Sequence, residues 1–542
     1  MSGKEQASEH VEGLESSSPE SDSKKHNVTL ATVIQHSKPN PWSRGYIRLY
    51  FMCLLVYLCA TMAGFDGQLM GSINAMKSYT EYYGLPAEGS SGTGLVFSIF
   101  QVAQMAASPF VWVIDWQGRR FCIFIGCFGT CVGAIITATA PTLGSFIGGR
   151  FILAFFSSFA CVAAPMYLLE LAPPQYRATV SGMYNTLYYF GAIIVTCTVY
   201  ATNRNMTGLV SWRLPLWLQM LCPGLVCLGI WLLPESPRWL VCKDRHEEAR
   251  DILADLHADG DRNHPLVELQ MTEIVEALKQ EGIMTWKNFF DLRVLFKTRA
   301  RRYRIMLNIA FSWFGQFSGN NIASYYLPYL VANVGITDTS TQLLLNIVYA
   351  ITGWIPAMIG ARLHDIIGRR KMLMGVTLGM AICLAITAAT AADYVHTGSK
   401  ASSRASIAFI YIFGSTFALA MTSMQPIYPG EVLSNDMRAK GMGVYSFTAA
   451  TAGFVNTFAA PVWLRKTKYW VYVFFVFWDI FECAFIYFFF VETKGRTLEE
   501  LDEIFEAPNP RKASTAKPLV EMEEKREVVL GRGCMISLKY LY

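Results

Sequence analysis

PMYLLELAPPQYRA at residues 165–178 returns 261 positions later as PIYPGEVLSNDMRA at residues 426–439. Both stretches contain Pro-x-Tyr-x-x-Glu, then six residues, then Arg-Ala. A second motif, Asp-x-x-Gly-Arg-Arg, occurs at 115–120 and again at 365–370. Two motifs that recur in the same order predict that the chain consists of two structurally related halves.

The composition is typical of an integral membrane protein. Hydrophobic residues make up 53% and charged residues 16% of the 542 residues, and the mean hydropathy is +0.29. Apolar runs such as 121–140 and 372–392 approach or reach the roughly 20 residues that a helix needs to cross a bilayer. The twelve predicted crossings lie near 47–74, 92–114, 121–141, 144–169, 179–201, 214–234, 303–334, 340–361, 371–393, 405–430, 441–464 and 469–491.

These crossings predict an all-α membrane fold of two six-helix bundles related by the repeat. The five predicted regions are a cytoplasmic disordered tail at 1–44, an N-terminal bundle at 45–235, a cytoplasmic helical linker at 236–302, a C-terminal bundle at 303–492 and a cytoplasmic tail at 493–542. Arg and Lys gather in the short loops on one side, which predicts that this side and both termini are cytoplasmic. The triplet beginning at Asn205 is then an external glycosylation acceptor.

Several function classes find no support in the residues. There is no His/Cys spacing of a metal site, no phosphate-binding loop and no nucleophile motif, so we expect neither an enzyme nor a bound metal or cofactor. The net charge of +5 is explained by cations in the cytoplasmic loops, and we expect no nucleic-acid partner.

Nine motifs resemble, in order, the signature elements of the sugar porters of the major facilitator superfamily. They are GFDGQLMG, DWQGRR, GGRFILAF, ELAPPQYRA, PESPRWL, QFSGNNIASYY, DIIGRRK, EVLSNDMRAKG and VETKGRTLEELDEIF. The resemblance spans about 45–505 and implies the twelve-helix fold of that family. The segments GQFSGNN and MYNTLYYFG are more similar to those of fungal lactose-permease-like and cellodextrin transporters than to those of monosaccharide carriers.

Asp66 is a carboxylate in the otherwise uncharged stretch 49–76 of the first crossing. An ionised side chain there costs several kcal/mol, so intramembrane carboxylates usually have a function. We interpret Asp66 as a proton carrier. The resemblance implies that Arg150 in the fourth crossing is its partner; the alternative is a purely structural bond between helices.

The seventh crossing carries a second candidate site, in which amides can donate to and accept from sugar hydroxyls. The resemblance implies that Gln316 and Asn321 bind the sugar and that Tyr325 and Tyr326 form an external gate. The intervening Ser318-Gly319 weakens the helix, as suits a gate or a site. Polar packing between helices is the alternative role for these four side chains.

Three departures from the pattern of monosaccharide porters predict a wider pocket. Gly315 stands where the first Gln of a Gln pair is usual, Asn185 replaces a longer Gln, and the tenth-crossing Gly-Pro-x-Pro-Trp is replaced around Gln425 and Pro426. We therefore expect a disaccharide or glycoside, with Asn185 and Gln425 as further candidate contacts. Three tryptophans are candidates for stacking on a sugar ring: Trp313, Trp354 and Trp478.

Ten charged residues repeat across the two halves at predicted helix ends, where ion pairs can form and break. The resemblance implies that they tie the bundles together when the carrier faces outward. These candidate gating residues are Asp115, Arg119, Glu170, Arg177, Glu235, Asp365, Arg369, Glu431, Arg438 and Glu492.

Together these features predict a secondary active sugar transporter that works by alternating access. We expect proton-coupled uptake of a disaccharide or glycoside of the lactose or cellobiose type, by a monomer in the plasma membrane of a fungus. The partners are then the sugar, protons and the lipid bilayer. A passive hexose facilitator, a non-transporting sugar sensor and a carrier of a non-sugar metabolite stay open as alternatives.

Overall fold

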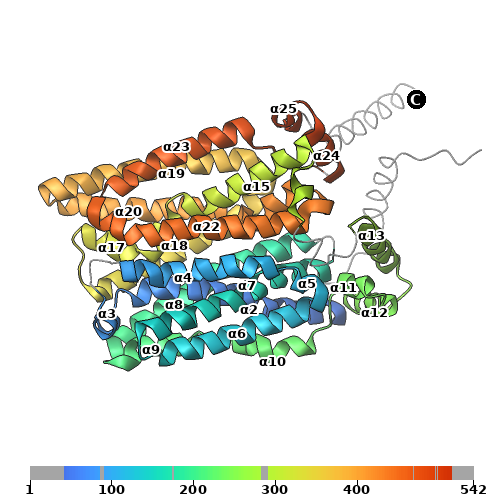
Figure 1. Cartoon of the computed structure of the whole chain (residues 1–542), viewed down its shortest axis with the longest axis horizontal. Coiled ribbons are helices and arrows are strands. Elements are labelled where there is room, and N and C mark those ends of the chain that lie inside the picture. Colours follow the sequence, from blue (N-terminus) through green and yellow to red (C-terminus); the bar gives the residue numbers. More distant parts are fainter. Residues whose placement is uncertain are drawn as a thin grey trace, which may run out of the picture. The chain divides into compact units, whose positions relative to one another are not determined.

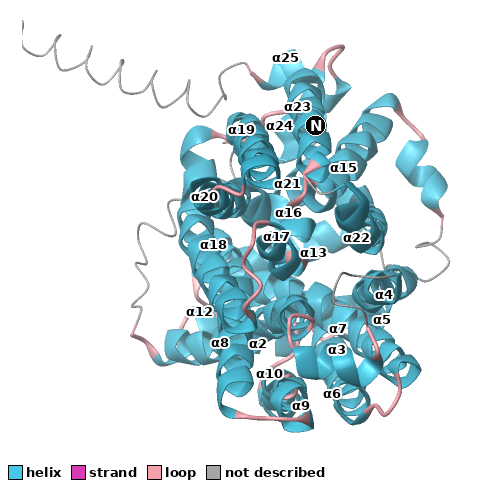
Figure 2. Ribbon diagram, turned by 90° about the vertical axis from the view of Figure 1, so that its left-hand side faces the viewer, coloured by secondary structure: helices cyan, strands magenta, loops and turns pink. Residues whose placement is uncertain are grey.

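The computed structural model describes residues 42–85, 91–173, 176–281, 291–467, 469–494, 496 and 498–515. Within these residues the regular structure is helical, without strands. Most of the predicted tails, at 1–41 and 516–542, lies outside the described residues. Figure 1 shows long helices running side by side, and Figure 2 views many of them close to end-on.

The predicted fold class is confirmed, since each of the twelve predicted crossings coincides with a described helix or a run of short helices. The first six are α2 (Arg44–Ile73), α4 (Ser91–Ala107) continued by η1 (Ser108–Phe110) and α5 (Val113–Gln117), α6 (Arg119–Thr139), α7 (Leu143–Leu171), α8 (Arg177–Asn205), and the run α9 (Leu209–Leu218), α10 (Leu221–Gly229) and η3 (Ile230–Leu232). A short helix, α3 (Lys77–Tyr83), follows α2.

The second six crossings have the same order. They are the run α15 (Arg299–Phe317), α16 (Asn320–Tyr325) and α17 (Leu327–Asn333), then α18 (Thr339–Ile367), α19 (Arg369–Thr397), the run α20 (Lys400–Phe417), η5 (Ala418–Thr422) and α21 (Ser423–Val432), α22 (Asn435–Thr467) and α23 (Trp470–Phe489). Helices α24 (Leu498–Glu506) and α25 (Pro510–Ser514) follow.

By length and composition, eight of the described spans are long and apolar enough to cross a membrane. The other predicted crossings, formed by α4, α8, α15–α17 and α22, are shorter, broken or less apolar. The sixth crossing begins at Leu209 rather than at the predicted residue 214, because Trp212 in its first turns is buried against the ring of Tyr79. Averaged hydropathy therefore locates the crossings but misplaces their ends.

The described residues divide into two compact units. One combines the chain up to Met52 with Ser236–Gly282, which carries α11 (Pro237–Cys242), α12 (His246–His257) and α13 (Pro265–Glu281). Its core includes Leu240, Leu253 and Val267. The stretch HEEARDILADLH, predicted to be helical, forms α12. The other unit, Cys53–Glu235 with Ile283–Tyr542, contains almost all of both bundles and the short η4 (Leu292–Phe296).

Within the larger unit two helix pairs make the most extensive described contacts between the two halves. Helix α4 packs on α22, and α8 packs on α18. In Figure 2 the C-terminal helices α15 and α19–α23 gather above the N-terminal helices α2 and α6–α10. Every candidate side chain described below lies in this unit.

Two glycines bring α2 and α8 into close backbone contact. A Cβ atom on Gly64 would collide with the carbonyl oxygen of Tyr188, and one on Gly191 would collide with the carbonyl oxygen of Thr61. Small residues at such positions allow helices to pack closely in a membrane. This contact positions the helix that carries Asp66 against the helix that carries Asn185.

Replacing Gly64 with alanine is expected to destabilise the folded protein by about 1–3 kcal/mol, because the added methyl group meets backbone that cannot yield without moving a helix. The measurement is the melting temperature of the detergent-purified protein, followed by size-exclusion chromatography. Gly144→Ala is the matched control, since nothing lies within 4 Å of a Cβ atom at that position. Equal melting temperatures for the two variants would contradict the close contact.

Candidate functional site

Asp66 lies at the centre of a buried polar group that joins three segments of the N-terminal half. Arg150 of α7 donates to its Oδ1 atom, and the Nε2 atom of Gln219, which follows α9, donates to the same oxygen at 2.6 Å. The exposed fractions are 3% for Asp66 and Arg150 and 2% for Gln219. The other carboxylate oxygen of Asp66 has no hydrogen-bond donor within the part of the chain that the structure describes.

This arrangement holds a charged pair out of water. The guanidinium of Arg150 also lies over the ring of Phe100, with its Cζ atom 5.6 Å from the ring centroid. A buried ion pair is stable only while both partners are present, because removing either one leaves an uncompensated charge. The sequence resemblance pointed to Arg150; Gln219 was missed, because nothing in its local sequence marks it as a partner of a residue 153 positions away.

The seventh crossing breaks where Ser318-Gly319 interrupts it. Helix α15 ends at Phe317, Gly319 has φ of 90°, and α16 begins at Asn320. A positive φ favours glycine, since it costs glycine no steric strain. The break frees the carbonyl group of Gln316 from the regular helix pattern and makes it available to side chains.

Two side-chain amides donate hydrogen bonds to this carbonyl oxygen. Asn321 donates from Nδ2 to the backbone oxygen of Gln316 at 3.0 Å and to its side-chain Oε1 at 3.2 Å. Asn456 of α22 donates to the same backbone oxygen at 2.9 Å. The structure thus brings together the predicted pair Gln316 and Asn321 and adds Asn456, which the sequence analysis missed.

The candidate contacts on α8 and on the tenth crossing belong to different halves of the chain, and the two segments are in direct contact. Asn185 donates from Nδ2 to the carbonyl oxygen of Thr422, and the hydroxyl of Tyr189 lies 3.2 Å from that of Thr422. Thr422 ends η5, a single π-helical turn. Such turns are frequent at functional sites, because they release backbone groups from the helix.

Gln425 lies one turn beyond Thr422, beside the unusual glycine of the seventh crossing. A Cβ atom on Gly315 would lie 3.4 Å from the Nε2 atom of Gln425. The absence of a side chain at the buried Gly315 therefore lets the amide of Gln425 lie close to the backbone of α15.

The predicted gate tyrosines lie where α16 meets α2 and α4. Tyr326 is fully buried and donates from its hydroxyl to the carbonyl oxygen of Thr457 at 2.8 Å. Phe97 packs against both tyrosines, with ring centroids 5.9 Å from Tyr325 and 4.7 Å from Tyr326. Nearby, Gln68 donates to the carbonyl oxygen of Ser324 at 3.3 Å. These contacts join the two halves at one end of the broken helix.

A first charge cluster, made of Asp115, Arg119, Glu170 and Glu235, lies at helix ends in the N-terminal half. Arg119 pairs with Asp115 at 3.0 Å and with Glu170 at 2.9 Å. Glu235 accepts the backbone N–H groups of Arg119 at 3.2 Å and of Arg120 at 3.3 Å. A carboxylate at the start of α6 satisfies amides that have no partner within the helix.

A second charge cluster, made of Asp365, Arg369, Glu431 and Glu492, repeats this geometry in the C-terminal half. Arg369 pairs with Asp365 at 2.9 Å and with Glu431 at 2.7 Å. Glu492 accepts the backbone N–H groups of Arg369 at 2.9 Å and of Arg370 at 3.2 Å. The structure thus assembles eight of the ten predicted gating residues into two equivalent clusters, each built from one half of the chain.

The remaining predicted residues have simpler surroundings. Arg438 donates to the carbonyl oxygen of Leu433 at 3.5 Å, and the side chain of Arg177 lies outside the described part of the structure. Asn205, the predicted glycosylation acceptor, is exposed at the end of α8. Trp354 packs near Phe190, with ring centroids 6.3 Å apart.

Two further buried carboxylates were missed by the sequence analysis. Asp479 and Glu482 lie in the middle of α23, and both are 0% exposed. The rule that singled out Asp66, a carboxylate in an apolar run, applies equally to residues 471–491. Their neighbours include so many aromatic residues that the run was interpreted as a plain apolar crossing.

Replacing Arg150 with glutamine is expected to destabilise the protein by about 3–5 kcal/mol, because Asp66 would remain buried without a cation. The double variant Asp66→Asn with Arg150→Gln removes both charges and should recover most of this loss. The double-mutant cycle compares the melting temperatures of the wild-type protein, Asp66→Asn, Arg150→Gln and the double variant. Strictly additive effects would contradict a direct interaction between the two side chains.

Comparison with known proteins identifies the family. The profile of the "Sugar (and other) transporter" family matches residues 52–505. The high-affinity glucose transporter of Kluyveromyces lactis is 28% identical over 493 residues, covering 84% of this chain and 85% of that one. The quinate permease of Neurospora terricola is 25% identical over 500 residues, covering 88% and 92%.

The fold agrees with a solved transporter structure. The xylose transporter XylE from E. coli, in a partially occluded inward open conformation, superimposes with a TM-score of 0.69 at 19% identity, covering 83% of this chain and 99% of that one. The chain therefore belongs to the sugar transporter family of the major facilitator superfamily and is a multi-pass membrane transporter.

Proposed function

We propose that this transporter carries a disaccharide or related glycoside into the cell together with a proton, by alternating access. The observation that carries the proposal is the buried Asp66, held by Arg150 and Gln219. A proton on Asp66 removes its negative charge and with it the ion pair to Arg150. The helices α2 and α7 then lose a bond that depends on charge, which gives a proton a means to change the conformation.

The polar groups near the broken helix suit a neutral, hydroxyl-rich substrate. Four of the six candidate binding side chains are amides, each able to donate and to accept: Asn185, Gln316, Asn321 and Gln425. Arg150, the cation in the group around Asp66, is engaged by that carboxylate. A quinate-like acid would need a cation to balance its charge, so these groups favour a sugar over a carboxylate.

Substrate size is proposed from Gly315 and Gln425. Gln425 lies next to the backbone of Gly315, and in this proposal the missing side chain at residue 315 widens the pocket enough for a second sugar ring. Tyr325 and Tyr326, which pack with Phe97 where the two halves meet, are proposed to close the external entrance. In this scheme the substrate contacts lie on both sides of the break between α15 and α16.

The two charge clusters are proposed to act as gating elements rather than as substrate ligands. Each links the start of one helix to carboxylates of neighbouring segments through Arg119 or Arg369. In the proposal, these carboxylates change their partners, within one half or between the halves, when the carrier changes between outward-facing and inward-facing states. We further propose that the protein works as a monomer in the plasma membrane, with both termini cytoplasmic and Asn205 glycosylated outside.

Uptake of radiolabelled lactose, cellobiose and glucose in transporter-deficient yeast at two external pH values tests this function. Accumulation of a disaccharide above equilibrium, stronger at acidic pH, is expected for the intact chain, because the proton gradient drives uptake. Asp66→Asn should abolish accumulation, since its side chain cannot release and rebind a proton.

The other outcomes separate the alternatives. Equilibration that is independent of pH and survives Asp66→Asn would make the protein a passive facilitator and refute proton coupling. Uptake of none of the sugars by a protein present at the cell surface would refute sugar transport and favour a sensor or a carrier of another metabolite. Surface expression is measured on the same cells with an epitope tag.

A glutamine at residue 315 tests the proposed room for a second sugar ring. Gly315→Gln is expected to lower disaccharide uptake relative to glucose uptake on the order of 10-fold, because the new side chain fills the space beside Gln425. Gly315→Ala, which adds one methyl group in ordinary contact at 3.4 Å, is the matched control. An unchanged ratio of the two sugars in Gly315→Gln would contradict this placement of the substrate.

A further inference from the structure

Asp479 and Glu482 lie one turn apart on the buried face of α23. That face continues toward both helix ends with apolar and aromatic residues such as Val471, Phe475 and Ile486. Both carboxyl groups are 0% exposed, and they are close enough to interact electrostatically. Neither belongs to the motifs that identify the family, and neither has a part in the function proposed above.

The pair has far fewer hydrogen-bond donors than two ionised carboxylates require. The indole Nε1 atom of Trp478 donates to Oε1 of Glu482 at 2.6 Å. Oε2 of Glu482 and both carboxyl oxygens of Asp479 have no hydrogen-bond partner among the described residues. Two adjacent negative charges in this position would be prohibitively unstable, so such groups take up protons instead.

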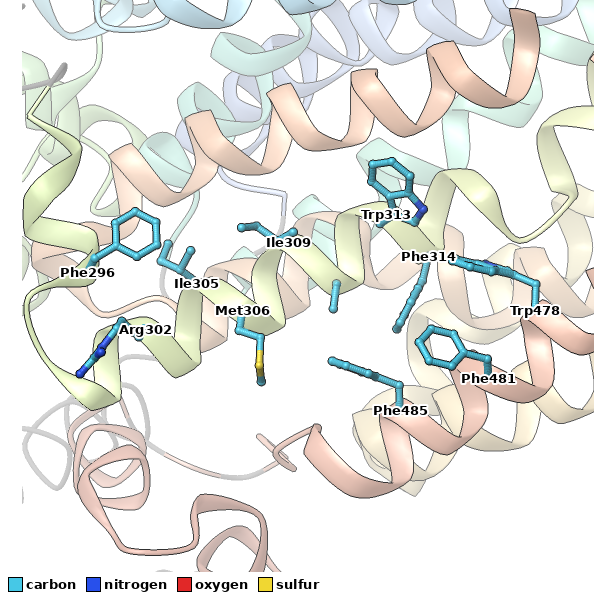
Figure 3. Close-up of a pocket in the computed structure, with 11 residues that line it drawn as sticks. Phe296, Arg302, Ile305, Met306, Ile309, Trp313, Phe314, Trp478, Phe481 and Phe485 are labelled. Atoms are coloured by element: carbon cyan, nitrogen blue, oxygen red, sulfur yellow. The ribbon is translucent and has the colours of Figure 1, made fainter. Parts of the chain in front are cut away.

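Three cations on the neighbouring segments are bound elsewhere, and a fourth, Arg302 of α15, lies at the opposite end of an apolar cavity from Trp478 (Figure 3). Arg370 of α19 donates to the carbonyl oxygen of Tyr487, beyond the pair toward the end of α23. Arg304 of α15 donates to the carbonyl oxygen of Val432 and pairs with Asp502. Lys440 of α22 donates to the carbonyl oxygen of Asp291.

The titratable group nearest to the pair in sequence is a thiol, Cys483, which donates to the carbonyl oxygen of Met374 of α19 at 3.7 Å. Among the described residues, the indole of Trp478 is the hydrogen-bond donor to Glu482, and neither carboxyl group has an ion-pair partner of the kind that Arg150 provides for Asp66.

Trp478 connects this pair to the break in the seventh crossing. Its ring lies edge-on to Phe317, the last residue of α15, with centroids 5.2 Å apart. One turn away, Phe475 lies 3.3 Å from where a Cβ atom of Gly319 would be. The hydroxyl of Ser318, between these two contacts, is buried and has no hydrogen-bond partner in the described residues. The segment that moves if the break changes is thus packed directly on the residue that binds Glu482.

Figure 3 shows that Trp478 also borders an apolar cavity between α15 and α23. The cavity has a volume of about 630 Å³, and its lining includes Trp313, Phe314, Phe481 and Phe485. The indole ring is therefore packed on Phe317 on one side and borders this open apolar space on another.

We propose that Asp479 and Glu482 form a second proton-binding site, in the C-terminal half, which acts through Trp478 on the break between α15 and α16. A proton is favoured over a metal cation, because Ca²⁺ takes six to eight oxygen ligands and the described residues offer no group of three or more His, Cys, Asp or Glu side chains that could hold a metal. The inference goes beyond the proposed function, since it requires neither Asp66 nor a particular substrate.

Infrared difference spectroscopy of the full-length protein in lipid nanodiscs tests this site. Spectra recorded between acidic and alkaline pH report the C=O stretching band of protonated carboxyl groups. The wild-type protein is expected to show such a band at neutral pH. The band should lose intensity in Asp479→Asn and in Glu482→Gln, and a component should persist in Asp66→Asn.

Three controls separate a proton site from other roles. Glu81→Gln, a change at an exposed residue, should leave the band unchanged. Trp478→Phe should shift the band to higher frequency, because Glu482 loses its hydrogen-bond donor, whereas a purely structural role of Trp478 would leave the frequency unaltered. Size-exclusion profiles establish that each variant is folded, and either of the two single amide variants suffices for the test.

Two results would overturn the inference. One is a band that is absent from the wild-type protein, or that keeps its intensity in whichever of Asp479→Asn and Glu482→Gln folds. The other is a wild-type band that disappears on addition of Na⁺, K⁺ or Ca²⁺ at constant pH, which would make the pair a cation site. Because none of these measurements involves transport, the inference can fail while the proposed uptake of a sugar stands, and the reverse holds as well.

Discussion

The hydrocarbon core of a bilayer supplies no water, so a buried polar group in this protein depends on partners from the protein itself. Regular helices satisfy their own backbone. The positions where this fails define the candidate site: the break at Ser318-Gly319 exposes the carbonyl group of Gln316, and Asn321 and Asn456 satisfy it. The same constraint accounts for Asp66, which is buried together with a cation and an amide donor.

The internal repeat explains why the two halves have the same arrangement of charged residues at their helix ends. In each half an arginine binds two carboxylates, and a third carboxylate accepts the N–H groups at the start of the following helix. An anion at a helix start is stabilised by the free N–H groups and by the helix dipole. Away from these ends the halves differ: in the described residues Asp66 has a cationic partner, whereas Asp479 has none.

Sequence reasoning was most informative where a residue type was conspicuous in its own neighbourhood. The repeated motifs predicted two bundles, and Asp66 stood out as a charge in an apolar run. Gln219 and Asn456 could not be predicted in this way, because each is one polar residue among many in its segment. Each is singled out only by its hydrogen bond to a residue more than a hundred positions away. Asp479 and Glu482 were hidden for another reason, since averaging over an aromatic-rich segment conceals two carboxylates.

The broken seventh crossing lies between the two acidic sites in the packing of the molecule. At one end, Gln68, two residues after Asp66, donates to the carbonyl oxygen of Ser324 in α16. At the other end, Trp478, the donor to Glu482, packs on Phe317 at the end of α15. In the proposed mechanism an ion-paired carboxylate changes the structure by losing its charge, whereas an unpaired acid would change it by gaining one. Loss of charge at one site and gain of charge at the other act on the same broken helix and can favour opposite states of the carrier. A conformational cycle passes through both of these states.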